Sequence, residues 1–473
     1  MTVAGKRIMI LGIGEAGRSA ARWLHGQGAQ IACCDSLHPS KWPVEFCEWC
    51  DQEGIRTLDE DALYGESFSD CDLAVVSPGV PPRGKAVRYF VDENVPVIGE
   101  LALAVSFCDG RLIGITGTNG KTTTTSLTAH ILSCGQIPNV KAGNISPPLF
   151  DLLDKDSKDT VAVLEISSFQ LEYFPTVWPE WLRRPQFSAA VFLNLMPDHL
   201  DRHKSVEEYG RCKARLFDFQ SGADLAILGP GLKGLVGKIR AKVFSICPER
   251  GNRIGGYWNQ RKDRLVMRFS DGHLEDYDLS SWKLKGEHNI HNLIAAAASA
   301  RWVGASSEAV QEGLETFDPP RFRFEHTSTH DGLIFINDSK ATNVAALIAA
   351  LKALEGKVTL IAGGRGKGED FSRLAEYLKG GNGTKKGARL ENAILIGEEA
   401  HRLRNALEPL VRQCLIVTGK DGRETLRQAV ELARSISEAG STVLLSPACA
   451  SFDMFSSYEE RGMVFDRIVK GLK

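Results

Sequence analysis

The sequence is poor in the features that mark membrane-spanning, secreted and nucleic-acid-binding proteins. Its 473 residues contain no apolar run near the ~18 residues of a membrane-spanning helix, and the N-terminal stretch lacks the apolar core of a signal peptide. The net charge is only −2, which gives no electrostatic argument for binding nucleic acid or an anionic membrane. We therefore expect a cytoplasmic protein with no nucleic-acid partner and no membrane insertion.

A disulfide framework is also missing. The eleven cysteines are odd in number and mostly scattered, which is typical of reduced thiols. Cys47 and Cys50 form one CxxC pair, and Cys33 and Cys34 lie upstream of it. Because there is no second CxxC and no neighbouring histidine pair, a zinc site is disfavoured.

What the chain contains instead is a repeated alternation of apolar strands with helical segments. A chain of this length is too long for one hydrophobic core. A polar segment at 317–326, with two adjacent prolines, interrupts the alternation, which then restarts. The pattern predicts mainly parallel sheets buried on both faces. We predict three consecutive α/β domains, at residues 1–99, 100–319 and 320–473.

Strands are predicted in all three stretches: RIMIL, QIACCD and DLAVVS in the first, and GLIFIND, KVTLIAGG, ENAILIG, QCLIVTG and STVLLSP in the third. The central stretch contains four more and a helix. A helix is expected near its end, at 289–304. Its strands are predicted at 111–116, 160–166, 187–194 and 223–229.

A glycine-rich turn follows the first apolar run of the chain, at residues 7–11. Gly12, Gly14 and Gly17 have the GxGxxG spacing, and a second apolar run ends in Asp35. This is the layout of a dinucleotide-binding turn with an acid placed to reach a ribose hydroxyl. The turn alone leaves two possibilities open, a nicotinamide cofactor or some other diphosphate.

A second nucleotide motif, GITGTNGKTTTT, occupies residues 114–125 at a predicted strand–loop–helix junction. Backbone amides of such a turn cradle phosphates, Lys121 is placed to reach the β and γ oxygens, and the Thr122 hydroxyl can ligate Mg²⁺. Isoleucine at position 115 departs from the strict GxxxxGK[ST] pattern. We predict an ATP-binding loop formed by Gly117, Thr118, Asn119, Gly120, Lys121, Thr122, Thr123 and Thr124.

Polar groups follow other predicted strands of this stretch. Glu165 ends a strand, where a carboxylate can ligate Mg²⁺ or merely cap a helix. The segment 194–203 concentrates Asp198, His199, Asp201 and His203, which could also be a polar loop. Lys213 lies on a predicted helix, where a solvated lysine is the ordinary interpretation. None of these residues is diagnostic alone.

Together these segments resemble the Mur ligase family of peptidoglycan synthesis over nearly the whole chain. The segments that carry the resemblance are GITGTNGKTTT, EISSFQLE, NLMPDHLDRH, YGRCKARLF, GEHNIHN, INDSKATN and LLSPACASFDMF, in that order. The resemblance implies a Rossmann-like N-terminal domain, a central P-loop ATPase-like domain with a mainly parallel sheet, and a Rossmann-like C-terminal domain. SSFQLE, NDSKATN and SPACASFD are typical of the member that adds D-glutamate to UDP-N-acetylmuramoyl-L-alanine. That reaction uses ATP, passes through an acyl phosphate, and belongs to the cytoplasmic stage of the pathway.

The resemblance also implies roles for single residues. It assigns the first glycine turn to UDP instead of NAD. Catalytic positions are Lys121, His199 and Lys213, and two Mg²⁺ ions are expected at Thr122, Glu165, His199 and a carbamylated Lys213. ATP would further contact Asn289, Asn292, Arg323 and Asp338. The UDP precursor is expected near Gly14, Asp35, Ser36, Ser77, Asn144 and Ser167, and D-glutamate near Lys340, Thr342, Lys367, Ser451, the Phe452 backbone and Tyr458.

Several positions depart from the family pattern. Glu15 adds a negative charge in the first turn and is expected to point outward; the other departures are Leu37, Phe322, Arg365 and Tyr458. The sequence also leaves three other functions open. They are another ligase of the family or a folate polyglutamylating enzyme, a nicotinamide oxidoreductase, and a non-catalytic protein that binds a nucleotide sugar.

We expect the protein to be a monomer.

Overall fold

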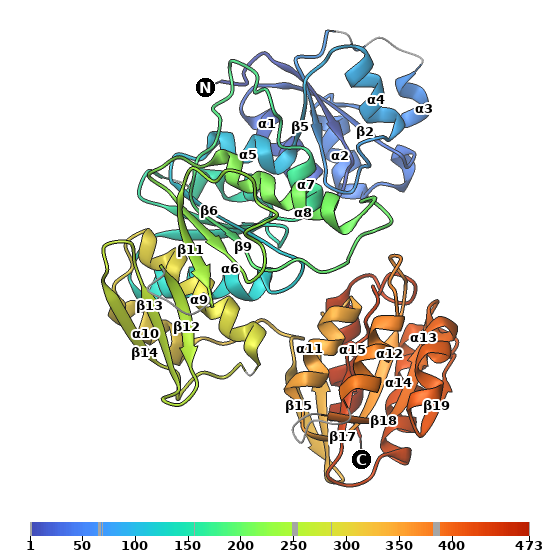
Figure 1. The fold of residues 1–473 in the computed structure, drawn as a ribbon. Helices are drawn as coiled ribbons and strands as arrows, with labels where there is room; N and C mark the ends of the chain where they lie inside the picture. The colour runs from blue at the N-terminus through green and yellow to red at the C-terminus, as the bar shows by residue number, and fades with distance from the viewer. Residues whose placement is uncertain are drawn as a thin grey trace. The chain divides into compact units, whose positions relative to one another are not determined.

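The computed structural model describes residues 2–64, 68, 70–155, 157–247, 254–284, 286–381 and 388–472 (Figure 1). These residues form three β-sheets. The chain divides into two compact units. The N-terminal unit contains Met1–Leu195, Glu207–Trp282 and His291–Phe317, and the C-terminal unit contains Met196–Val206, Lys283–Ile290 and Asp318–Lys473. The first two sheets belong to the N-terminal unit and the third to the C-terminal unit.

The first sheet is parallel throughout, in the order β3-β2-β1-β4-β5. Its strands bury apolar side chains on both faces, as the sequence predicts for a parallel sheet. The order reverses between β1 and β4, and ligands of such sheets bind at that point beyond the strand ends. The strands are β1 (Arg7–Leu11), β2 (Gln30–Asp35), β3 (Arg56–Asp59), β4 (Leu73–Val76) and β5 (Val97–Gly99), with helices α1 (Glu15–Gly26), α2 (Val44–Gln52), α3 (Glu60–Leu63) and α4 (Lys85–Asp92).

The second sheet has the order β14-β13-β12-β11-β10-β9-β6-β8-β7. The four predicted strands are present as β6 (Arg111–Thr116), β8 (Val161–Glu165), β9 (Phe187–Phe192) and β10 (Leu225–Leu228), with the last three shorter than predicted. The remaining strands, which were not predicted, are β7 (Asn139–Gly143), β11 (Lys242–Ile246), β12 (Gly255–Asn259), β13 (Arg264–Arg268) and β14 (Leu274–Asp278). The β12–β13 and β13–β14 pairs are antiparallel, and β14 alternates buried and exposed side chains.

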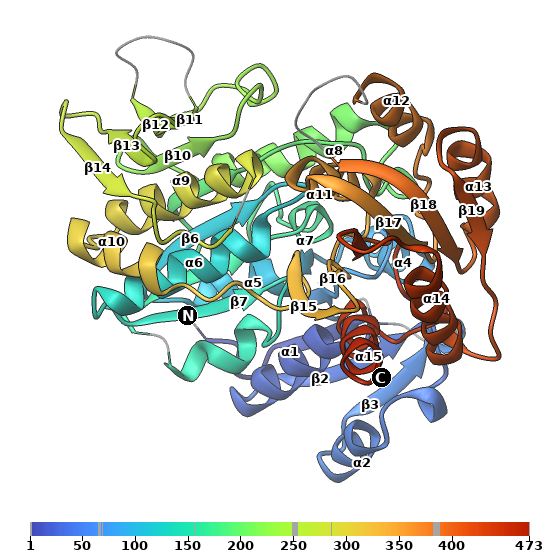
Figure 2. The same ribbon diagram turned by 90° about the horizontal axis from the view of Figure 1, so that it is seen from below.

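Helices pack on this second sheet and join it to the first. The predicted helix near 289–304 is α9 (Glu287–Trp302), which begins two residues earlier than predicted. Helices α6 and α10 lie side by side in both views (Figures 1 and 2). Helix α5 is buried from Glu100 to Ser106. It belongs to a hydrophobic core whose residues come from both sheets, with Val3 the first and Ala241 the last in the sequence. The helices are α5 (Glu100–Phe107), α6 (Lys121–Cys134), α7 (Ser168–Glu172), α8 (Val206–Ala214), α9 and α10 (Ser307–Thr316).

The third sheet has the order β15-β16-β20-β17-β18-β19, and only the β15–β16 pair is antiparallel. Two hydrophobic cores cover its two faces, one with α11, α12 and α13 and the other with α14 and α15 (Figure 2). The strands are β15 (Glu325–His330), β16 (Leu333–Asn337), β17 (Gly356–Gly363), β18 (Ala388–Ile396), β19 (Gln413–Ile416) and β20 (Thr442–Leu445). The helices are α11 (Val344–Ala353), α12 (Ser372–Gly381), α13 (Ala400–Leu407), α14 (Gly422–Ile436) and α15 (Tyr458–Lys470). Among the described residues, no helix is long and apolar enough to cross a membrane.

Candidate active site

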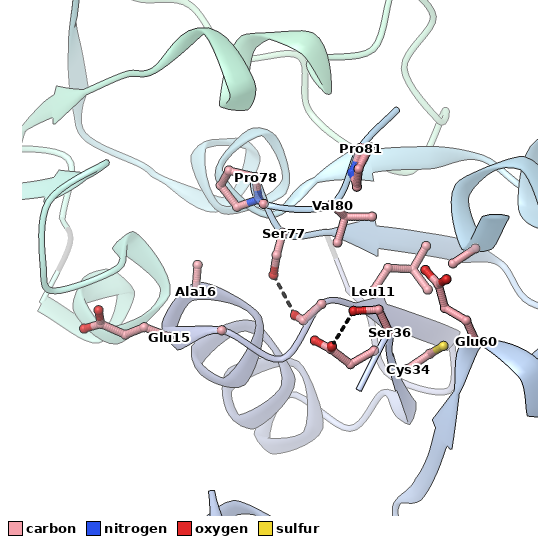
Figure 3. Close-up of a pocket in the computed structure, with 15 residues that line it drawn as sticks. Leu11, Glu15, Ala16, Cys34, Ser36, Glu60, Ser77, Pro78, Val80 and Pro81 are labelled. Carbon is pink, nitrogen blue, oxygen red and sulfur yellow. Dashed lines mark hydrogen bonds between the residues drawn. The ribbon is translucent and has the colours of Figure 1, made fainter. Parts of the chain in front are cut away.

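A pocket of about 340 Å³ lies at the carboxyl ends of β1, β2 and β4 (Figure 3). The glycine turn forms one side of it. Gly12 has a φ of +89°, and a Cβ on Gly17 would lie 1.9 Å from the Gly12 carbonyl oxygen, so both positions require glycine. The lining residues are Leu11, Gly12, Gly14, Glu15, Ala16, Cys34, Asp35, Ser36, Glu60, Ser77, Pro78, Gly79, Val80, Pro81 and Ala86.

Asp35 holds the glycine turn from the end of β2. One carboxylate oxygen accepts a 2.7 Å hydrogen bond from the Ile13 amide, and the other accepts from the Leu37 amide at 3.0 Å. Across the pocket, the Ser77 hydroxyl donates to the Gly12 carbonyl at 2.7 Å (Figure 3). Both Asp35 oxygens are therefore engaged by backbone amides, and Ser36 lies beside them with its hydroxyl 3.2 Å from Asp35.

Glu15 extends away from the other labelled side chains of the pocket (Figure 3). Its carboxylate accepts a 2.7 Å hydrogen bond from the Ser146 hydroxyl of the central domain. This is the outward direction expected from the sequence. The negative charge at this position is thus directed toward the central domain.

One asparagine of the central domain fixes the phosphate loop, and a second lies against it. The Asn194 side chain accepts from the Asn119 amide at 2.9 Å and donates to the Asn119 carbonyl at 3.0 Å. Gly120 has a φ of +86°, and a Cβ there would lie 2.1 Å from the side-chain oxygen of Asn292. Asn292 was predicted at the nucleotide, whereas Asn194 was missed, since only its place in NLMPDHLDRH could have suggested it.

Lys121 begins α6 and folds over the loop. Its ammonium donates to the carbonyls of Gly117 and Thr118, both at 2.9 Å. The amide of Thr118 in turn donates to the Asn194 carbonyl at 3.0 Å. Thr123 and Thr124 follow in the first turn of α6 and are almost fully buried, with exposed fractions of 4% and 0%.

Oxygen atoms gather where β8 ends beside α6. The Thr122 hydroxyl donates a 2.6 Å hydrogen bond to Glu165, and the Asn144 amide group donates to the other Glu165 oxygen at 3.0 Å. Ser167 caps α7 two residues further on, and Gln170 completes a capping box with it. Hydroxyl and carboxylate oxygens are the ligands that Mg²⁺ prefers, so this donor set fits the ion expected here.

Lys213 lies on α8 and is almost fully buried, with 1% of its surface exposed. Its amine nitrogen lies 4.4 Å from the centre of the Tyr209 ring. The adjoining Cys212 thiol donates to the Ser168 carbonyl at 3.2 Å, which ties α8 to α7.

His199 belongs to a short segment, Met196–Val206, of the C-terminal unit. It has a positive φ of 54°, an uncommon conformation for a residue other than glycine. Its amide donates to Asp198 at 2.9 Å. The Asp198 carboxylate also accepts from the Asn343 side chain at 3.0 Å and lies 3.9 Å from the Lys367 ammonium. Asp198 therefore joins the histidine segment to the loops after β16 and β17, a role that sequence reasoning did not assign.

The residues predicted to bind D-glutamate follow three neighbouring parallel strands of the third sheet. Lys340 and Thr342 follow β16, Lys367 follows β17, and Ser451 follows β20. Ser451 is buried, whereas Phe452 is 63% exposed. The structure thus brings these loops to one end of the sheet.

Two further contacts shape these loops. The Lys340 ammonium lies 3.7 Å from the centre of the Tyr458 ring. Arg461 is completely buried and donates to the Ser339 hydroxyl and carbonyl at 3.0 and 2.8 Å and to the Cys449 carbonyl at 3.2 Å. Burial lowers the pKa of the Arg461 guanidinium to about 10. Arg461 therefore holds two of the loops through neutral acceptors and was not predicted from the sequence.

Arg365, a departure from the family pattern, is paired elsewhere. Its guanidinium lies 2.9 Å from Glu398, and this hydrogen bond raises its pKa. The backbones of Arg365 and Ala450 exchange hydrogen bonds of 2.9 and 3.0 Å, which join the loops after β17 and β20. The side chain is therefore directed to Glu398, while its backbone helps to shape the loops.

The predicted nucleotide-side residues of the C-terminal unit lie around Asp338. Burial raises the pKa of the Asp338 carboxyl to about 7, although the Ser446 hydroxyl and the Phe324 amide donate to it at 3.0 and 3.1 Å and Arg323 favours its ionised form. Phe322 and Phe324 flank Arg323 with positive φ values of 63° and 52°. Asn289, on α9, is also buried. Among the described residues, no group of three His, Cys, Asp or Glu side chains is arranged to hold a metal.

Comparison with known sequences assigns the chain to a family. The N-terminal domain of the MurD-like Mur ligases matches residues 6–99, the Mur ligase middle domain matches 115–300, and the glutamate ligase domain of Mur ligases matches 322–449. The chain belongs to the Mur ligase family. The family resemblance drawn from the sequence motifs is thus confirmed.

Two relatives that align with the chain over its full length are ligases of the same name. The chain is 36% identical to the UDP-N-acetylmuramoylalanine–D-glutamate ligase of Koribacter versatilis over 474 residues, which covers 99% of this chain and 98% of the relative. It is also 36% identical to the ligase of the same name from Geotalea uraniireducens over 479 residues, covering 100% and 99% of the two chains. The fold is similar to that of MurF ligase from Thermotoga maritima in complex with ADP, with a TM-score of 0.53, 14% identity, and coverage of 99% and 96%.

Proposed function

We propose that this protein is an ATP-dependent ligase that joins D-glutamate to UDP-N-acetylmuramoyl-L-alanine. Full-length identity to two ligases of that name supports the proposal. The observation that carries it is the phosphate loop with Lys121 above it and the Thr122–Glu165 pair beside it. A protein that only bound a nucleotide sugar would have no use for this second nucleotide site.

The chemistry explains why ATP is needed. A carboxylate is a poor acyl donor because its leaving group would be oxide. Transfer of the γ-phosphoryl group to the precursor's carboxylate releases ADP and forms an acyl phosphate. The amine of D-glutamate then attacks the acyl carbon, and phosphate leaves as the amide bond forms. The protein's task is to position anions and to balance their charge.

The N-terminal unit supplies groups suited to the phosphates. In the proposed reaction, Lys121 exchanges the carbonyls of Gly117 and Thr118 for phosphate oxygens, so its charge offsets that of the transferred group. Thr122, Glu165 and a carbamylated Lys213 of this unit, with His199 of the C-terminal unit, would hold two Mg²⁺ ions, which supply positive charge to the phosphates when bound. The oxygen donors among these groups are of the kind that Mg²⁺ prefers.

The pocket on the first sheet is proposed to bind the UDP part of the precursor. The glycine turn offers backbone amides and the start of α1 to a diphosphate. Asp35 is held by the Ile13 and Leu37 amides, so it fixes the glycine turn beside the proposed UDP site. D-glutamate is proposed to bind the loops that carry Lys340, Thr342, Lys367 and Ser451, where two ammonium groups and two hydroxyls suit two carboxylates.

Measurement of ADP formation tests this proposal. We expect ADP release with UDP-N-acetylmuramoyl-L-alanine and D-glutamate together, and little release when either substrate is omitted. A panel of other amino acids distinguishes other ligases of the family, and a folate substrate distinguishes a polyglutamylating enzyme. An NADH fluorescence titration tests the oxidoreductase alternative. ADP release with a different amino acid, or none with D-glutamate, would refute the proposed substrate. We further propose that the enzyme acts in the cytoplasm. We also propose that it is a monomer, which analytical ultracentrifugation would check.

A further inference from the structure

Tyr173 connects the central domain to the pocket of the first domain. It follows α7, and its ring is buried in the same apolar cluster as Leu11 and Val76 of the first sheet. Only 7% of its surface is exposed. Its hydroxyl donates a 2.8 Å hydrogen bond to the carbonyl of Val80, which lines the pocket. A residue of the central domain thus contacts the backbone of the pocket wall.

The pocket wall in question is the Ser77–Pro81 loop, all of whose residues line the cavity (Figure 3). The first domain fixes the start of this loop, because the Ser77 amide donates to the Leu11 carbonyl at 2.8 Å and the Ser77 hydroxyl to Gly12 at 2.7 Å. Near the other end of the loop, the Tyr173 hydroxyl donates a hydrogen bond to the Val80 carbonyl. The loop is therefore held from both domains.

Tyr173 is itself firmly held. The Gly99 amide donates to the Tyr173 carbonyl at 2.9 Å, and a Cβ on Gly99 would lie 2.8 Å from the Tyr173 Cβ. The Arg215 guanidinium donates to the carbonyls of Leu171, Glu172 and Phe174, where α7 ends. Within α7, the Gln170 side chain donates to the buried Glu100 at 3.2 Å. These contacts fix the hydroxyl that meets Val80.

We propose that Tyr173 is a positioning residue for the UDP precursor, acting through the Val80 carbonyl on the Ser77–Pro81 loop. This inference rests on the proposed function, since it takes the pocket as the site of the UDP part. The Val80 carbonyl belongs to the peptide that joins Val80 to Pro81, and proline has no N–H, so this hydrogen bond fixes the loop backbone and not the direction of an amide donor. Fixing the loop from outside the first domain sets the shape of the pocket wall before the ligand arrives.

The Tyr173→Phe variant removes the hydroxyl and keeps the buried ring. We expect the KM for UDP-N-acetylmuramoyl-L-alanine to rise about three- to tenfold, the range given by loss of one neutral hydrogen bond. The KM values for ATP and D-glutamate, and kcat, should stay within about twofold. Titration of UDP by calorimetry should show an affinity weaker by a similar factor. The melting temperature should change little, because the ring still fills the same apolar cluster.

Tyr64→Phe is the matched control. It removes another phenol-to-carbonyl hydrogen bond of the first domain, 3.0 Å long, but its acceptor Lys85 does not line the pocket and its side chain is exposed. This control should leave all three KM values unchanged. Unchanged UDP affinity in Tyr173→Phe, or a parallel change of all KM values with a lower melting temperature, would overturn the positioning role. Failure of the proposed function is distinguished by a wild-type protein that binds UDP but forms no ADP with the two substrates.

Discussion

The hydroxyl of Thr122 donates a 2.6 Å hydrogen bond to the carboxylate of Glu165, from the first turn of α6 to the end of β8. The two residues lie 43 positions apart in the chain. Their contact depends on β6 and β8 being neighbours in the second sheet, so that the loop after one strand meets the end of the other. In the proposed reaction, the Thr122 hydroxyl oxygen and the Glu165 carboxylate oxygen would both bind a Mg²⁺ ion.

The first prediction removes this hydroxyl. Thr122→Val keeps the shape of the side chain and should lower kcat by about ten- to a hundredfold, the effect of losing one contact to a charged group. Thr122→Ser retains the hydroxyl and should keep most of the activity. ADP formation across a range of Mg²⁺ concentrations measures both variants. Equal activity of the valine and serine variants would contradict a metal role for Thr122.

The second prediction concerns the buried Lys213. Lys213→Ala should be nearly inactive, and acetate or another small carboxylate should restore part of the activity, because the proposed functional group is a carbamate oxygen. Small amines should not restore it. ADP formation is measured with each additive, and mass determination of the intact wild-type protein checks for the added carbon dioxide. Rescue by amines alone would mean that the ammonium is the functional form.

The third prediction tests the proposed D-glutamate site. Lys367→Ala should raise the KM for D-glutamate by about ten- to a hundredfold, as expected for a lost hydrogen bond to a carboxylate. The KM values for ATP and the UDP precursor should stay nearly constant. Arg365→Ala is the control, since the Arg365 guanidinium is paired with Glu398 and not with Lys367 or Ser451 in the contacts described above. A D-glutamate KM unchanged in Lys367→Ala would place the amino acid elsewhere.

The fourth prediction concerns stability against pH. Burial raises the pKa of Glu100 to about 7, although the Gln170 side chain donates to it. Its pKa in the unfolded chain is about 4.3, so between these values the folded state binds the extra proton. The free energy of unfolding therefore falls as pH rises from about 4 to 7 and does not fall further above that range.

Glu100→Gln should abolish this loss. Relative to wild type, the variant should gain up to about 3 kcal/mol of stability above pH 7 and gain little near pH 4. Urea unfolding measured at several pH values between 4.5 and 8 gives the comparison. Parallel stability curves for the two proteins would show that Glu100 ionises in the folded state without this penalty.

The sequence predicts the parts of the fold that have simple local patterns. Apolar runs between helices predict the parallel strands β6, β8, β9 and β10, and the glycine spacing predicts the turns that require positive φ. The strands β7 and β11 to β14 were missed because polar or glycine residues interrupt their apolar runs, and in β14 buried and exposed side chains alternate. The pairing of β11 to β14 depends on the preceding strand β10, which presents its edge to β11.

The site shows the same division between local and long-range information. Lys121 and Thr122 are predicted because one motif places them at a strand–loop–helix junction. Asn194 and Arg461 were not predicted because each acts on backbone groups that are distant in the sequence. A single asparagine or arginine has no local pattern that reveals such partners. Contacts of this kind become visible only when the sheet order is known.

The placement of residues Met196–Val206 with the C-terminal unit affects how the protein can be divided for expression. A fragment that starts at residue 320 would contain Asn343 and Lys367 but would lack Asp198, whose carboxylate contacts both. The buried Asn343 side chain would lose this acceptor, and the Lys367 ammonium would keep Glu369 but lose the negative charge of Asp198. An isolated C-terminal fragment that keeps these contacts would therefore need the eleven-residue segment Met196–Val206, joined by a designed linker or added as a separate peptide.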